Sequence, residues 1–154
     1  MCTKTKVLEL CKWSNKLKPH HMGTYEEKLS ILSEMIAFAR VDHSLKQSEY
    51  DFLLQVARSL GVDEDTFKGL LKERPPKVRL KTQADRIVQF HRLMLLMNID
   101  DEQHKKEIDR LYNIGLRMGL PPAAISQVLE VMHRYPDKIV PPNVLINIFR
   151  AHYN

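Results

Sequence analysis

Hydrophobic residues recur along this chain with the period of amphipathic α-helices, and runs of β-branched residues, which favour strands, are absent. Glycine is also sparse, with five residues in the chain. The pattern therefore predicts an all-α fold, a compact bundle of seven to eight helices and no strand. We expect these helices at residues 3–18, 25–40, 47–60, 63–71, 83–98, 105–118, 121–134 and 142–152.

Short polar and glycine signals mark where the predicted helices begin and end. Thr24 with Glu27 has the spacing of a capping box, in which each residue bonds the backbone N–H of the other. Gly61 and Gly119 follow long helices, where a left-handed residue commonly ends the helical turn. Pro75–Pro76 ends the fourth helix, since proline cannot continue a helical hydrogen-bond pattern.

Two of the predicted helices, 25–40 and 83–98, contain stretches with apolar residues on every side of the helix. These stretches are residues 35–39 and 93–97. A helix without a polar face is buried on most of its sides. We therefore expect this pair at the centre of the bundle, with the other helices packed around it.

The chain contains an internal repeat with a constant offset of 58 residues, which aligns residues 28–72 with residues 86–130. Any two amphipathic helical hairpins would share some apolar positions. A common pattern of Asp, then Glu seven residues on, then Gly twelve residues later is harder to attribute to chance. The aligned residues are Asp42, Glu49 and Gly61 in the first copy and Asp100, Glu107 and Gly119 in the second.

The length of 154 residues indicates a single domain that spans 1–154. Two similar helix–turn–helix units, at about 25–72 and 83–132, would form its centre. The helices at 3–18 and 142–152 would pack on these units.

Composition places the chain among ordinary globular proteins, with 44% apolar and 28% charged residues. No run of about 18 apolar residues is present, so we expect no membrane span. Cys2 and Cys11 lack the spacing of a metal site or of a disulfide framework, which indicates reduced thiols and a cytoplasmic location. The seven histidines show no zinc-ligand spacing either, and we expect them at the surface or partly packed.

Asp42 and Asp100 each follow an apolar helix, where the negative end of the helix dipole disfavours a carboxylate. Two arrangements would compensate for this. In the first, the aspartate faces the next helix's free N–H groups while Glu49 or Glu107 caps that helix. In the second, calcium, magnesium or manganese is bound jointly by Asp42, Glu49, Asp100 and Glu107.

The strings IAFARVDHSLKQSEYDFLLQVARSLGV and LMLLMNIDDEQHKKEIDRLYNIGLRMGL resemble the TerB family of tellurite-resistance proteins. The resemblance covers about residues 25–132, with the N-terminal and C-terminal helices outside it. It implies a compact all-α, non-catalytic domain associated with bacterial chemical-stress systems and proposed to bind metal through acidic clusters. The residues that match the family's acidic positions are Asp42, Glu49, Asp100 and Glu107.

A basic link at about 72–86 joins the two copies, and the net charge of the chain is +5. Lys77, Arg79 and Lys81 make this link the best candidate surface for an acidic partner, although charge runs are most often plain solvated surface. No aromatic residue interleaves the charges, as stacking on single-stranded nucleic acid would require.

These features predict a module that acts by binding a protein partner or a divalent cation. The alternative is a module that binds nucleic acid or an anionic surface through the basic link. An enzyme is the least favoured class, because the chain has no nucleophile elbow and no phosphate-binding glycine motif. A metal-dependent hydrolase built on the four carboxylates would also lack the Glu-x-x-His pattern of di-metal bundles.

Overall fold

The computed structural model describes residues 23–41, 44–99 and 105–153, and in these ranges every regular element is helical. This confirms the predicted all-α fold, while the helix predicted at 3–18 lies outside the described residues. The elements are α2 (Tyr25–Ala39), α3 (Gln47–Ser59), α4 (Glu64–Lys72), α5 (Gln83–Met97), α6 (Lys105–Arg117), α7 (Pro122–Val131), η1 (Met132–Arg134), η2 (Pro136–Lys138) and α8 (Pro142–Ala151).

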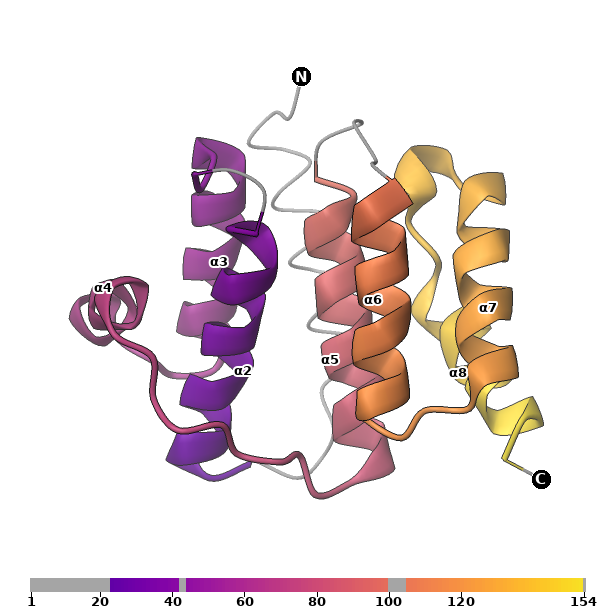
Figure 1. Cartoon of the computed structure of the whole chain (residues 1–154), viewed down its shortest axis with the longest axis horizontal. Helices are drawn as coiled ribbons and strands as arrows, with labels where there is room; N and C mark the ends of the chain where they lie inside the picture. The colour runs from indigo at the N-terminus through magenta and orange to yellow at the C-terminus, as the bar shows by residue number, and fades with distance from the viewer. Residues whose placement is uncertain (1–22, 42–43, 100–104, 154) are drawn as a thin grey trace.

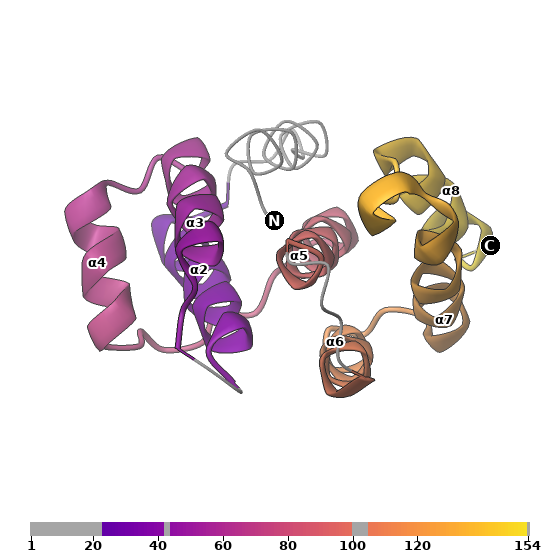
Figure 2. The same ribbon diagram turned by 90° about the horizontal axis from the view of Figure 1, so that it is seen from above.

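The helices form a broad bundle with α4 at one end and α7 with α8 at the other (Figures 1 and 2). Helix α2 packs against α3, α4 and α5, and α5 packs in turn against α6. Helix α7 lies between α6 and α8. The segment 73–82 runs along one edge of the bundle and joins α4 to α5 (Figure 1). Among the described helices, none combines the length and the apolar character that crossing a bilayer requires.

The internal repeat reappears in the helix bounds. Helices α2 and α5 begin and end 58 residues apart, and so do α3 and α6. The turns that follow α3 and α6 also share one geometry. Gly61 and Gly119 have φ angles of 76° and 82°. The N–H of Val62 bonds the carbonyl of Ala57 at 2.9 Å, and the equivalent bond after α6 is 3.1 Å long. The described helices of the two units therefore have equivalent bounds, and the turns that follow α3 and α6 share a backbone hydrogen bond.

A threonine caps the start of each of the two central helices, and the cap of α2 is the predicted capping box. At α2, the N–H of Glu27 donates to Thr24 Oγ1 at 3.2 Å, and the N–H of Thr24 donates to Glu27 Oε2 at 2.9 Å. At α5, Thr82 Oγ1 accepts from the N–H of Asp85 at 3.1 Å. These side chains satisfy N–H groups that the first helical turn leaves unpaired.

The core is centred on α2 and α5, as the apolar stretches predicted. Residues 93–97 of α5 are buried without exception. In α2, Met35, Ile36, Phe38 and Ala39 are buried, whereas Ala37 is only half-buried. This exception has a structural cause, because Ala37 faces a groove between α2 and α6.

His91 departs from the prediction that the histidines lie at the surface or partly packed. Its side chain is fully buried in α5, and its Nε2 lies 3.4 Å from the carbonyl oxygen of Val140. Helical position explains the difference, since α5 is buried on nearly every side and cannot offer a polar face to this residue.

Candidate functional site

Glu49 is the third residue of α3 and is 6% exposed. Its Oε1 accepts a hydrogen bond of 3.0 Å from the backbone N–H of Lys46. This bond is the capping contact of the first arrangement considered for the acidic turns. Glu107 occupies the same position in α6 and is half-buried.

Asp42 and Asp100 lie outside the described residues, so the joint cation site stays a prediction. Within residues 23–41, 44–99 and 105–153, no cluster of three or more His, Cys, Asp or Glu side chains could hold a metal ion. The charged and polar side chains that the described residues bring close together lie beside the basic link instead.

The basic link is attached to the helices by its backbone. Ser30 Oγ of α2 accepts from the N–H of Val78 at 3.0 Å and donates to the Val78 carbonyl oxygen at 3.3 Å. Arg86 of α5 donates through Nε to the Leu80 carbonyl at 3.0 Å and through Nη2 to the Lys81 carbonyl at 3.3 Å. The link is thus anchored at two points, rather than being only a solvated tether.

Anchoring gives the link an alternating pattern of exposure. Val78 and Leu80 are half-buried, whereas Lys77, Arg79 and Lys81 are exposed. The link therefore turns its aliphatic side chains toward the bundle and leaves its charges at the rim.

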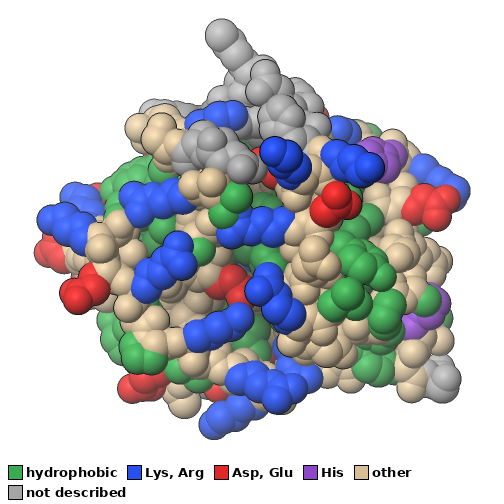
Figure 3. All heavy atoms as spheres, in the orientation of Figure 1, with side chains coloured by type: hydrophobic (Ala, Val, Ile, Leu, Met, Phe, Trp, Pro, Cys, Tyr) green, Lys and Arg blue, Asp and Glu red, His purple; other side chains and the backbone are tan. Residues whose placement is uncertain are grey.

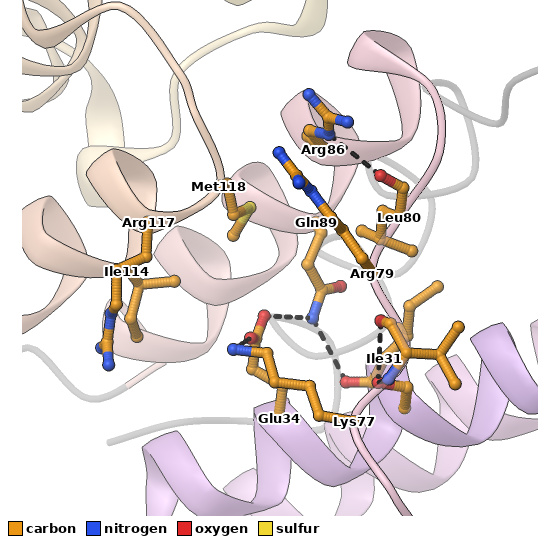
Figure 4. Close-up of a pocket in the computed structure, with 12 residues that line it drawn as sticks. Ile31, Glu34, Lys77, Arg79, Leu80, Arg86, Gln89, Ile114, Arg117 and Met118 are labelled. Atoms are coloured by element: carbon orange, nitrogen blue, oxygen red, sulfur yellow. Dashed lines mark hydrogen bonds and ion pairs between the residues drawn. The ribbon is translucent and has the colours of Figure 1, made fainter.

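A cavity of about 430 Å³ lies where this link passes α2, α5 and α6 (Figure 4). The volume is within the range of small-ligand and side-chain binding pockets. Five aliphatic side chains from α2, from α6 and the residue after it, and from the link form its apolar lining. These are Ile31, Val78, Leu80, Ile114 and Met118.

A second cavity of about 240 Å³ shares Ser30, Glu34, Lys77, Ile114 and Arg117 with the first. We call the continuous depression formed by the two cavities the α2–α6 groove. Six basic side chains and one carboxylate line it. They are Arg74, Lys77, Arg79, Arg86, Arg110 and Arg117, with Glu34 as the single acid. Figure 3 shows Lys and Arg side chains gathered over the middle of this face.

The single carboxylate is held in place from two sides. Glu34 Oε1 accepts from Gln89 Nε2 at 3.1 Å, and Glu34 Oε2 lies 3.7 Å from Lys77 Nζ (Figure 4). Gln89 also donates to the Ile31 carbonyl at 3.2 Å, and these two residues are equivalent positions of the repeat. The Glu34 side chain is 23% exposed, whereas that of Lys77 is 74% exposed. A negative charge therefore lies inside a basic rim.

Two of the cations that line the larger cavity remain available to a ligand. Arg79 extends from the link and Arg117 from α6, and both are exposed (Figure 4). Within the described part of the chain, neither guanidinium has a hydrogen bond or ion pair. Arg110 differs, because it lies 5.5 Å over the Phe38 ring and donates to the Ala37 carbonyl at 3.3 Å.

The sequence analysis found part of this groove. Lys77 and Arg79 line it as candidate partner-binding residues, whereas Lys81 is exposed beyond its lining. Sequence reasoning missed Glu34 and Arg117. Arg110 and Arg117 are seven residues apart on α6, a spacing that puts both on one helical face and could have drawn attention to it.

Residues 2–72 match the family model of the tellurite resistance protein TerB. Comparison with curated proteins gave no match, and neither did comparison with solved structures. The matched region begins before residue 25, where the resemblance was predicted to start, and it ends with α4, before the second copy of the repeat. Residues 2–72, somewhat less than half of the chain, are therefore similar to TerB, which agrees with the resemblance that the sequence predicted.

Proposed function

We propose that this chain is a non-enzymatic TerB-like module that binds an acidic segment of a partner protein in the α2–α6 groove. The main support for the proposal is the position of Arg79 and Arg117 beside one apolar cavity. Their guanidinium groups come from different elements, and neither has a hydrogen bond or ion pair within the described residues. Guanidinium groups pair with carboxylates through two parallel hydrogen bonds, so they suit acidic side chains.

The lining of the groove favours a protein over nucleic acid. Among the described residues, no aromatic side chain lines the larger cavity, and Phe38 in the smaller one already has Arg110 over its ring. Binding of a single strand requires aromatic side chains on which bases can stack. The five aliphatic side chains of the larger cavity, in contrast, would pack against the apolar groups of a ligand.

The TerB match supports the remaining parts of the proposal. TerB-like domains are generally non-catalytic, and the family's name associates them with tellurite resistance. We therefore infer a role in a bacterial stress response. We also infer a cytoplasmic site of action, since Cys2 and Cys11 have no disulfide-like pattern.

Fluorescence anisotropy with a labelled polyglutamate peptide tests the proposal. We expect binding at low ionic strength that weakens as salt is added, because exposed charges are screened. The double variant Arg79→Glu and Arg117→Glu should weaken binding by about tenfold or more. The matched control is Arg134→Glu, an exposed arginine of η1 outside the groove, which should bind like the unaltered protein.

Two results would reject the groove as the binding site. One is the absence of peptide binding at low ionic strength. The other is an equal loss of affinity in the control and in the double variant, which would indicate an effect of net charge alone.

A further inference from the structure

We propose that the α2–α6 groove recognises a short segment in which acidic residues flank one large aliphatic side chain, such as leucine or methionine. This inference rests on the proposed function and specifies its ligand. The aliphatic side chain would enter between Ile31, Ile114 and Met118, and the flanking carboxylates would pair with Arg79 and Arg117.

The apolar lining supplies the first argument. Ile31 and Ile114 are 9% and 7% exposed, and Met118 and Leu80 are half-buried around a cavity of about 430 Å³. Aliphatic surface that borders an open cavity gains free energy when an apolar group displaces water from it. A ligand made only of acidic residues would leave this gain unused.

The position of Glu34 supplies the second argument. Its carboxylate lies inside the groove, held by Gln89 of α5 and close to Lys77. A ligand carboxylate in the centre of the groove would therefore compete with Glu34 for Lys77, whereas an uncharged group would leave that ion pair intact. At the rim, Arg79 and Arg117 attract negative charge instead. The groove thus matches a ligand that is uncharged in the middle and acidic on either side.

The internal repeat supplies the third argument. The 58-residue offset maps the gap between α2 and α6 onto the gap between α5 and α3. Four of the equivalent residues are more buried than their counterparts in the groove: Val56 is 2% exposed, Val88 4%, Arg92 5% and Leu95 is fully buried. Ser59 and Leu60, the equivalents of Arg117 and Met118, are half-buried. The chain therefore covers the counterpart positions more completely than it covers the α2–α6 groove.

A set of labelled peptides tests the pattern directly. The first peptide carries glutamates on both sides of a single leucine, the second replaces the leucine by alanine, and the third replaces the glutamates by glutamine. We expect the first to bind at least about tenfold more tightly than the second, because a buried leucine contributes more apolar area than alanine. The third should bind most weakly.

Variants of the groove test which residues contact the leucine of the peptide. Leu80→Ser removes part of the apolar lining at a half-buried position of the link, and it should reduce the leucine-over-alanine preference to about threefold or less. The control is Ile146→Ser, on the exposed face of α8, which should keep the preference. Glu34→Gln removes the central charge and should raise affinity for polyglutamate more than for the leucine peptide. Thermal melts verify that each variant is folded.

The outcomes separate this inference from the proposed function. Equal binding of the leucine and alanine peptides would overturn the inference and leave an acidic-segment module in place. Failure of every acidic peptide to bind would reject both. Tighter binding of a single-stranded oligonucleotide than of the leucine peptide would also overturn the inference, in favour of a phosphate-binding groove.

Discussion

At the scale of single residues, His91 is a group whose acid–base chemistry the fold changes strongly. Burial lowers the pKa of its imidazole to about 4, although the Val140 carbonyl partly opposes this effect and the neighbouring Arg92 adds to it. Its Nδ1 has no hydrogen-bond partner within the part of the chain that the structure describes. The neutral imidazole is therefore the form that the folded core accommodates.

This shift predicts how stability depends on pH. The folded-state pKa lies below the ordinary value of 6.5, so the unfolded chain takes up the His91 proton first as pH falls. The contribution to the free energy of unfolding is complete above about pH 6.5 and is lost as pH falls toward about 4. The loss amounts to about 2 kcal/mol by pH 5. Urea unfolding between pH 5 and 7 measures it.

A variant isolates the histidine from other titrating groups. His91→Gln cannot take up a proton in this range, so its stability should vary less with pH than that of the unaltered chain, whatever its absolute value. The exposed His133→Gln is the matched control and should keep the original slope. Identical slopes for all three proteins would show that His91 does not titrate as its burial requires.

Residues of the groove show where sequence reasoning reaches its limit. Lys77 and Arg79 stand out in the sequence because they belong to a run of charges. Glu34 does not, because it belongs to no run of charges and is one of several polar residues on α2. Its role depends on Gln89, which is 55 residues away and meets it only when α2 crosses α5. A contact of this kind follows from tertiary packing and leaves no local pattern.

At the scale of elements, the acidic turn before α3 has two competing explanations. The observed bond from the Lys46 N–H to Glu49 favours a helix cap, whereas a bound cation would need the same carboxylate. Under the capping explanation, Glu49→Ala should lower the free energy of unfolding by about 1 kcal/mol. Glu49→Gln should lose less, since its amide oxygen can still accept. Chemical unfolding with and without millimolar calcium measures both effects.

Calcium distinguishes the two explanations. A cap predicts that the melting temperatures of the unaltered chain and of both Glu49 variants do not respond to the ion. Binding predicts a rise with calcium in the unaltered chain, lost in both Glu49 variants and when Asp42 and Asp100 become Asn. Glu130→Ala, at an exposed position of α7, controls for the loss of one charge and should leave stability nearly unchanged.

Element boundaries were predictable because their signals are local. The caps at Thr24 and Thr82 and the stop at Gly61 each act within a few residues of the chain. The end of α7 was predicted less accurately. The helix predicted to continue to residue 134 gives way to a 3-10 turn after Val131. Helix ends often tighten in this way, and the sequence pattern does not distinguish the two forms.

At the scale of the whole molecule, the two units share their first two helices and then differ. Helix α4 returns to pack on both α2 and α3, whereas α7 packs on α6 and on α8. The sequence could predict the repeated pair, since the offset is constant. It could not predict this difference, or the groove beside the link, because both depend on how complete units are placed against each other.

The central contact between α2 and α5 also predicts that neither unit is stable alone. Leu32 and Met35 of α2 and Phe90 of α5 are fully buried in a core that draws on both units. A fragment that ends after the family-matched region would expose this apolar face to water, at a cost that a small domain cannot offset. Residues 1–76 alone should therefore unfold without a cooperative thermal transition by circular dichroism.

Mixing that fragment with residues 77–154 should restore a cooperative transition, since the fragments can rebuild the α2–α5 contact. The groove requires the same assembly, because its lining comes from α2 in the first fragment and from the link and α6 in the second. Binding of an acidic peptide should thus return only with the mixture. A first fragment that melts cooperatively on its own would show instead that the family-matched region is an autonomous unit and that the second unit is an addition to it.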